Sequence, residues 1–73
     1  MLPADLLTYA RQHGYTHLRY AGEAVLFLYR PAPSDPTRWG EKMVLHRPGY
    51  LYLEAPTILV DALPADAQPL SNP

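Results

Sequence analysis

Cysteine is absent from this 73-residue chain, and its absence excludes several kinds of protein at once. Without thiols there is no disulfide framework, no zinc site built on cysteine, no iron–sulfur cluster and no thiol nucleophile. A domain this small buries only about 60% of the surface that its unfolded chain exposes. Its stability therefore has to come from packing, from self-association or from a partner.

The sequence also lacks an excess of charge of either sign and any long hydrophobic run. Six Lys and Arg face seven Asp and Glu, so there is no basic surface of the kind that attracts duplex DNA or an anionic membrane. The longest apolar run, residues 24–29, is far shorter than the roughly 20 residues needed to cross a bilayer. Pro3 and Asp5 lie where a secretory signal needs an apolar segment, which predicts a cytoplasmic protein with no membrane association.

Motifs for catalysis, cofactors and metals are equally scarce. The four glycines stand singly, which excludes a phosphate-binding loop and a dinucleotide fingerprint. The two serines, Ser34 and Ser71, lie in no nucleophile-elbow context. His13 and His17 have the spacing of a helical metal pair, but Gly14 is expected to end the helix between them. We therefore expect no enzymatic activity, no cofactor and no bound metal.

What the sequence does contain begins with one helical segment, residues 3–13. Pro3 suits the first turn of a helix, and Asp5 lies near the positive end of the helix dipole. An apolar stripe runs along the segment, and Gly14 supplies the left-handed conformation that ends a helix. Because so short a helix is marginal in isolation, it must pack on something.

From residue 15 onward, aromatic and branched residues predict strands, of which 16–20 and 23–30 form a hairpin. A three-residue loop, which we favour, places Arg19 opposite Glu23. It gathers on one face Thr16, Leu18, Ala24, Leu26 and Leu28. A two-residue loop exchanges the faces and gathers Leu18, Val25 and Phe27 instead. In either case residues 24–29 are apolar on both sides, which predicts a central strand covered on both faces.

The second half of the chain is punctuated by proline. Residues 31–40 are predicted to be a stiff connection outside the sheet, which either has a function or places Trp39 over the core. Residues 41–46 and 50–54 form a second hairpin, in which Pro48 and Gly49 suit the centre of a type II turn. Residues 57–61 predict a fifth short strand. Residues 64–73 have too little apolar content to order themselves and predict a flexible proline-rich tail.

These elements predict an α+β fold in a single domain that spans residues 1–63. One N-terminal helix is followed by a small antiparallel sheet or partly closed barrel of four to five short strands. One helix covers only one face of such a sheet, yet the strands carry apolar residues on both. The excess apolar surface is then buried by closing the sheet into a barrel, or against a second copy or another protein.

The class of function that these features favour is a non-catalytic protein-interaction, accessory or regulatory protein. Tyr, Trp and Arg are the residue types that anchor protein interfaces, and they are concentrated outside the predicted helix. We expect the protein to act as a homo-oligomer, such as a homodimer, or bound to a larger protein. The residues expected to contact the partner are Tyr15, His17, Arg19, Trp39, Arg47, Tyr50 and Tyr52.

A domain that binds single-stranded nucleic acid is the alternative. Six Tyr, one Trp and one Phe provide stacking surfaces, and small five-stranded barrels often bind single strands. The negative net charge and the lack of an aromatic-basic motif of the RNP type make this prediction the less favoured one.

Overall fold

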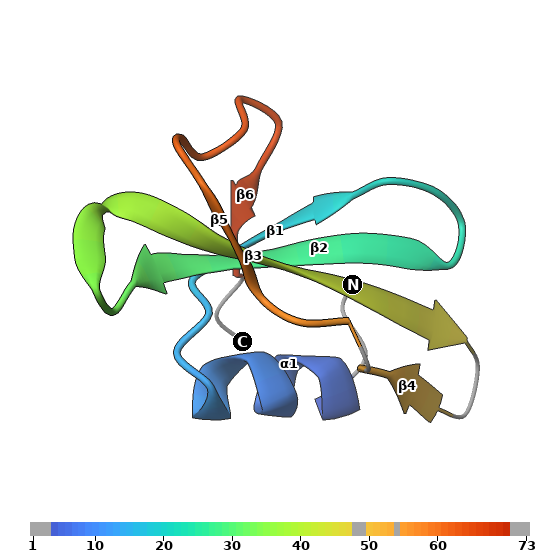
Figure 1. Ribbon diagram of the computed structural model, residues 1–73. Coiled ribbons are helices and arrows are strands. Elements are labelled where there is room, and N and C mark those ends of the chain that lie inside the picture. The colour runs from blue at the N-terminus through green and yellow to red at the C-terminus, as the bar shows by residue number, and fades with distance from the viewer. Residues whose placement is uncertain (1–3, 48–49, 54, 71–73) are drawn as a thin grey trace.

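The computed structural model describes residues 4–47, 50–53 and 55–70, and it confirms the α+β fold class. One helix precedes an open antiparallel sheet of six strands in the order β4-β3-β2-β1-β6, with β5 paired to β3 (Figure 1). The elements are α1 (Ala4–Gln12), β1 (His17–Tyr20), β2 (Val25–Ala32), β3 (Asp35–Arg47), β4 (Tyr50–Tyr52), β5 (Ile58–Val60) and β6 (Gln68–Pro69). Of the two predicted architectures, the open sheet is therefore the one that forms.

The helix α1 begins and ends close to its predicted limits. Asp5 lies in its first turn, near the positive end of the helix dipole. At the other end Gly14 has a φ of 78°. The Tyr15 amide donates to the Ala10 carbonyl over 2.9 Å. The Gly14 amide donates to the Arg11 carbonyl over 3.2 Å. These two bonds form the Schellman motif, which a left-handed glycine makes possible.

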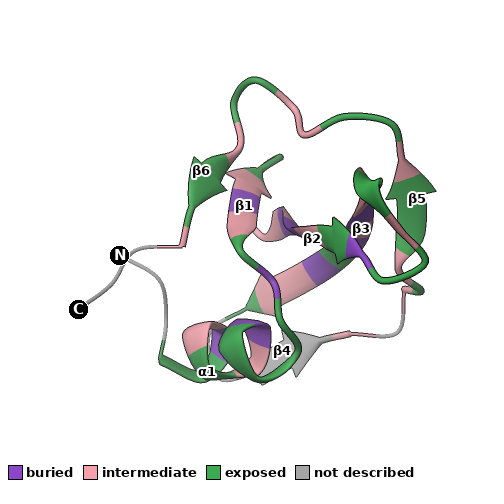
Figure 2. Ribbon diagram, turned by 90° about the vertical axis from the view of Figure 1, so that its left-hand side faces the viewer, coloured by how far each residue is buried: buried purple, intermediate pink, exposed green. Residues whose placement is uncertain are grey.

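The core lies between α1 and the face of the sheet that is turned toward it, which we call the first face. Figure 2 shows buried residues where α1 approaches β1, β2 and β3. The cluster consists of Leu6, Ala10, Tyr15, Leu18, Leu26, Leu28 and Val44. Full burial of one Leu or Val side chain contributes about 1.5–3 kcal/mol, so this cluster is the main source of stability on the first face.

The first hairpin has the predicted faces but not the predicted loop. Arg19 pairs with Phe27, so the expected pairing of Arg19 with Glu23 is wrong. The Ala21 amide donates to the Val25 carbonyl over 2.9 Å, which closes a longer connection. The pairing of β1 with β2 is shifted by four residues from the predicted pairing. A shift by an even number leaves every side chain on its predicted face, so Leu18, Leu26 and Leu28 still share the first face.

Residues 31–40 were predicted to be a loop, and this prediction is wrong. The strand β2 extends to Ala32 and β3 begins at Asp35, so a two-residue turn joins two long strands. Pro31 of β2 pairs with Trp39 of β3. The pairing of β2 with β1 ends at Tyr29, so within the described chain β2 has a neighbouring strand on one side only at Pro31. A residue without an amide hydrogen is tolerated there because only one edge of the strand has a neighbour to bond.

The second hairpin and the fifth strand form as predicted. The register of β3 and β4 pairs Arg47 with Tyr50, which leaves the expected two-residue connection. Pro48 and Gly49, the predicted turn, lie outside the described residues. The strand β5 pairs Leu59 with Gly40 of β3.

Residues 64–70 differ from the flexible tail that the sequence predicted. The strand β6 pairs with β1, and the Leu70 amide donates to the Thr16 carbonyl over 3.0 Å. The Leu70 side chain packs against the core cluster. The connection between β5 and β6 passes over the face of the sheet opposite α1, which we call the second face (Figures 1 and 2). Residues 71–73 lie outside the described residues.

Candidate interaction site

Tyr15, one of the seven residues predicted to contact a partner, belongs to the core. Its side chain is 4% exposed, and its hydroxyl lies 2.8 Å from Oγ1 of Thr57. The Arg30 guanidinium lies over its ring, 4.8 Å from the centroid. Tyr15 therefore joins the end of α1 to the segment before β5.

His17, Arg19 and Trp39 are brought together on the second face, because residues two apart on a strand point to the same side. The rings of His17 and Trp39 meet edge to face with their centroids 5.4 Å apart. The Arg19 guanidinium lies 4.6 Å from the centroid of the Phe27 ring. Trp39 is half-buried on the second face, so it does not cover the core next to α1.

The other three predicted residues lie at or beyond the end of β3. Arg47 is the last residue of that strand and is exposed. The side chains of Tyr50 and Tyr52 are outside the described part of the chain. A partner-binding role for these residues stays a prediction.

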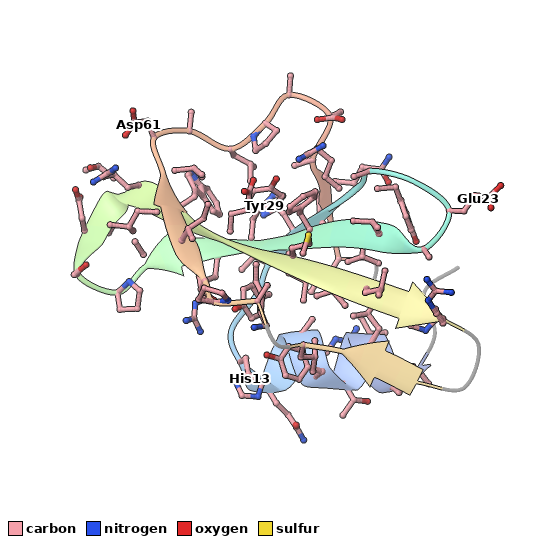
Figure 3. All side chains as sticks on the ribbon, turned by 45° about the vertical axis from the view of Figure 1, so that its right-hand side comes forward. His13, Glu23, Tyr29 and Asp61 are labelled. Carbon is pink, nitrogen blue, oxygen red and sulfur yellow. The ribbon has the colours of Figure 1, made fainter. Side chains whose placement is uncertain are left out.

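A chain of hydrogen bonds joins three neighbouring strands across the second face. Nε of Arg19 on β1 donates to the Tyr29 hydroxyl on β2 over 3.1 Å. That hydroxyl donates to Oε2 of Glu41 on β3 over 2.6 Å. Tyr29 is fully buried, and Asp66 of the β5–β6 connection lies 3.9 Å from Nε of Arg19. Figure 3 shows Tyr29 beneath this connection, so residues of the chain itself close that part of the second face.

The surroundings of the Tyr29 hydroxyl determine its protonation state. Burial raises the pKa of the Tyr29 hydroxyl, and the hydrogen bond to Glu41 raises it further, while the bond from Arg19 acts in the opposite direction. The same bond with Tyr29 raises the pKa of Arg19. The hydroxyl therefore stays protonated at neutral pH and holds one oxygen of the Glu41 carboxylate.

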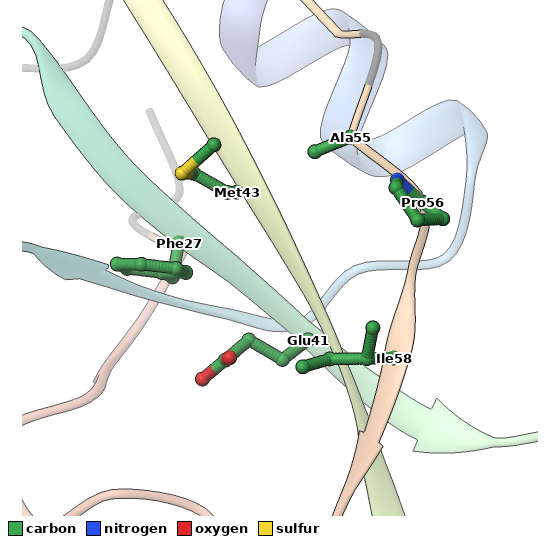
Figure 4. Close-up of a pocket in the computed structure, with 6 residues that line it drawn as sticks. All are labelled: Phe27, Glu41, Met43, Ala55, Pro56 and Ile58. Carbon is green, nitrogen blue, oxygen red and sulfur yellow. The ribbon is translucent and has the colours of Figure 1, made fainter.

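Beside these hydrogen bonds the second face is open and forms a pocket of about 260 Å³, the second-face pocket. Its lining comes from β2, β3, β5 and the segment before β5 (Figure 4). The lining residues are Phe27, Glu41, Met43, Ala55, Pro56 and Ile58. Five of these are apolar, and the exposed lining is almost wholly apolar, since the Glu41 carboxylate accepts a hydrogen bond from the buried Tyr29 hydroxyl. Met43 and Ile58 are 46% and 52% exposed, so the wall of the pocket meets water in the free protein.

The strand β5 also exposes an apolar residue on the other side of the sheet, because Leu59 pairs with Gly40 and points away from the face that carries Ile58. Leu59 is 49% exposed, and the described chain places no strand beside the outer edge of β5. None of the three residues of β5 is charged or a proline, the residue types that commonly protect a strand edge from pairing.

The described residues form no arrangement that would bind a metal. No group of three or more His, Asp and Glu side chains lies close enough together within that part of the chain to hold an ion. His46 lies 4.0 Å from an Asp5 oxygen, and His17 is paired with the Trp39 ring. None of the described helical residues forms a segment long and apolar enough to span a membrane.

The residues of the second-face pocket were not among those predicted to bind a partner. Their signal in the sequence was the alternation within residues 24–29, where the residues not facing α1 are also apolar. Phe27 follows from that alternation once the first face is known. Ala55, Pro56 and Ile58 do not, because their place beside Met43 depends on how the chain returns from β4 to β5.

Comparison of the chain with models of protein families, with curated proteins and with solved structures finds no match. Its function has to be inferred from the geometry of this small α+β domain.

Proposed function

We propose that this protein is a small, non-catalytic interaction domain that binds a segment of another protein at the second-face pocket. The observation that carries the proposal is the pocket itself, whose lining is almost wholly apolar and in which Met43 and Ile58 are each about half exposed. Covering apolar surface is favourable by about 25 cal/mol for each Å² removed from water. Contiguous exposed apolar surface on a soluble domain is characteristic of interaction sites.

A second copy of the chain fits this surface less well than a segment of another protein. A stable interface buries about 800 Å² on each partner. Among the large apolar side chains that the described chain exposes, Met43 and Ile58 lie at the pocket, whereas Leu59 points to the other face of β5 and Tyr20 lies at the end of β1. A short segment of another protein needs only a surface of this smaller extent.

Single-stranded nucleic acid is the alternative ligand, and the geometry supports it less. Stacking on bases requires exposed rings. Tyr15 and Tyr29 are buried, and the Trp39 ring is in contact with His17. The lining of the pocket includes no cationic side chain that would attract phosphate.

The test compares the wild-type chain with a Met43→Glu variant, in which a carboxylate enters the apolar wall of the pocket. Tyr20→Glu is the matched control, because it introduces the same charge at an exposed apolar residue outside the pocket. Proteins captured from the native cell by the immobilised chains are identified and purified, and their Kd values are measured for all three chains. We expect a partner that binds wild type and Tyr20→Glu alike and Met43→Glu at least about tenfold more weakly.

Three outcomes would overturn the proposal. In the first, no purified protein binds in a way that depends on Met43, although circular dichroism shows that the variant is folded. In the second, sedimentation shows a dimer of this chain that Met43→Glu dissociates, which makes a second copy the occupant. In the third, the chain binds labelled oligonucleotides with an affinity that falls as salt rises, which supports the alternative.

A further inference from the structure

We infer that the bound protein segment is extended and pairs as an added strand with the outer edge of β5, the strand that carries Ile58 of the second-face pocket. The inference rests on the proposed function and names the conformation and the chemistry of the segment. It is carried by the unpaired edge of β5, by exposed apolar residues on both faces beside that edge, and by the lack of charge along the strand.

The outer edge of β5 presents main-chain hydrogen-bonding groups to which the described chain brings no strand. β5 pairs with β3 along its inner edge, and Figure 2 shows it at one end of the sheet. On an edge strand every second residue turns its amide and carbonyl outward, and an extended segment supplies both an acceptor and a donor to them. A helix bonds its main-chain groups internally and would leave those of β5 to water. The edge therefore favours an extended occupant.

Exposed apolar side chains lie beside this edge on both faces of the sheet. Ile58 is 52% exposed on the second face, at the pocket. Leu59 is 49% exposed on the first face, where it lies opposite Gly40, which has no side chain to cover it. The side chains of an added strand also alternate between the faces, and directly opposite Cβ atoms lie about 4.5–5.5 Å apart. Two adjacent residues of such a strand therefore cover Ile58 and Leu59 together, which an occupant confined to the pocket does not.

The chemistry of the edge favours an uncharged, apolar segment. All three residues of β5 are apolar. Asp61, which follows the strand, already has a partner, because one of its oxygens lies 3.1 Å from Nη2 of Arg38. A charged side chain placed beside Ile58 or Leu59 would lose water without gaining a partner. The end of the sheet at β6 differs, since that strand has two residues and Pro69 has no amide hydrogen to donate.

A second copy of the chain is the poorer occupant of this edge. Two copies joined through β5 would pair over three residues each, whereas a stable interface buries about 800 Å² on each partner. A segment of another protein is not limited to the length of β5. After pairing with the edge it can continue over the pocket, where Met43 is 46% exposed.

The test begins with selection of displayed random twelve-residue peptides on the immobilised wild-type chain. We expect the selected peptides to share a run of adjacent uncharged apolar residues without proline, and not the three- and four-residue spacing of an apolar helix face. A synthetic copy is then methylated at one main-chain amide at a time. Methylation of an amide that points toward β5 removes a hydrogen bond and should weaken binding about tenfold or more, whereas its two neighbours should change it less than about threefold.

A matched pair of variants separates strand addition from binding in the pocket alone. Leu59→Glu places a charge beside the edge at a residue that does not line the pocket, and we expect it to weaken peptide binding about tenfold or more. Tyr20→Glu introduces the same charge at an exposed apolar residue of β1 and should leave the Kd unchanged. Circular dichroism shows whether both variants are folded. In wild type, the outward amides of β5 should exchange their hydrogen more slowly when the peptide is bound.

The inference is overturned if selection yields no peptides, if methylation has no alternating effect along the peptide, or if a folded Leu59→Glu binds as wild type does. Sedimentation that shows a dimer which Leu59→Glu dissociates would make a second copy the occupant, and would overturn it as well. Peptides that depend on Met43 but not on Leu59 would leave the interaction domain standing and remove the added strand. Loss of both dependences would remove the proposed function too.

Discussion

Gly14 is the residue whose backbone conformation fixes where α1 ends. Its φ of 78° lies in the left-handed region, and two hydrogen bonds of the Schellman motif depend on it. The residue that follows, Tyr15, then turns back into the core, with its ring 6.3 Å from that of Tyr9. The glycine therefore positions an aromatic side chain that joins α1 to the sheet.

We predict that Gly14→Ala lowers the free energy of unfolding by about 1 kcal/mol, because a Cβ atom disfavours the left-handed conformation. Gly22→Ala is the control. Gly22 has no positive φ, and an added Cβ there meets no atom within 4 Å. Urea denaturation of both variants measures the difference. Equal stabilities of the two variants would show that the φ of Gly14 is not what limits the substitution.

Tyr29 is the residue whose hydroxyl links three strands on the second face. Its ring is fully buried on the second face, and its hydroxyl lies between Arg19 and Glu41. A buried hydroxyl without partners costs about 1–3 kcal/mol, so these two bonds are what allow a tyrosine at this position. The second of these bonds also holds the side chain of Glu41, which lines the second-face pocket.

Among the elements, the segment between β4 and β5 is held by a buried cation. Lys42 projects from β3 and donates to the carbonyl oxygens of Leu53 and Ala55. β4 and β5 pair with different parts of β3, and this segment crosses from one to the other. It also supplies two residues of the pocket, Ala55 and Pro56. The ammonium of Lys42 therefore fixes one wall of the candidate site.

We predict that Lys42→Met, which keeps the length of the side chain, lowers the free energy of unfolding by about 1–3 kcal/mol, because two carbonyl oxygens lose their donor. Arg47→Met removes a cation from an exposed position of the same strand and should cost less than about 0.5 kcal/mol. Guanidinium chloride denaturation compares the two. A Lys42→Met variant as stable as Arg47→Met would mean that water replaces the ammonium without loss.

The elements also show which parts of the fold can be predicted from a single sequence. The helix was predictable because Asp5, the apolar stripe and Gly14 are local signals. The faces of the first hairpin were predictable because apolar alternation sets the parity of the register. The length of its loop was not predictable, since several loops satisfy the same parity and the choice depends on contacts with β3 and β6.

Proline was the signal that misled the prediction for residues 31–40. Proline excludes a residue only from positions where its amide would bond to a neighbouring strand. Pro31 lies where one edge of β2 has no neighbour, and Pro69 lies in β6 at the edge of the sheet. Whether a strand is an edge strand depends on the topology, which the local sequence does not contain.

The candidate site was predictable only in part for the same reason. The sequence indicated that apolar residues lie on both faces of the sheet, and His17, Arg19 and Trp39 were expected on a binding surface. The structure places these three on the second face, with Arg19 next to the β5–β6 connection and His17 in contact with Trp39. The open pocket lies farther along that face, where β2, β3 and β5 meet, and no local pattern brings Phe27 and Ile58 together.

Considered as a whole, the molecule covers the two faces of its sheet unequally. The helix α1 and Leu70 pack against the first face. Residues 61–67, between β5 and β6, cross the second face and close it over Tyr29 (Figures 1 and 3). The chain itself thus covers part of the apolar surface that, from the sequence, a partner was expected to bury. What is left uncovered is an apolar surface of limited extent, where β2, β3 and β5 meet.

The dependence of overall stability on alkaline pH tests whether this covering of the second face holds in solution. Burial raises the pKa of Tyr29 above its ordinary value near 10, and the hydrogen bond to Glu41 adds to the rise. Because the folded state binds this proton more tightly than the unfolded state, the contribution of Tyr29 is complete below about pH 10 and is lost as the pH rises through the folded-state pKa.

We therefore predict that the free energy of unfolding of wild type exceeds that of Tyr29→Phe by about 1–3 kcal/mol at pH 7, and that the difference shrinks above about pH 10. Urea denaturation of both proteins from pH 7 to pH 11.5 measures it. Tyr20→Phe is the control, because Tyr20 is 55% exposed and its hydroxyl lies outside the hydrogen bonds of the second face. A difference that stays constant to pH 11.5 would contradict the buried state of Tyr29. The β5–β6 connection would then not exclude water from the second face, and the pocket beside it would extend over Tyr29.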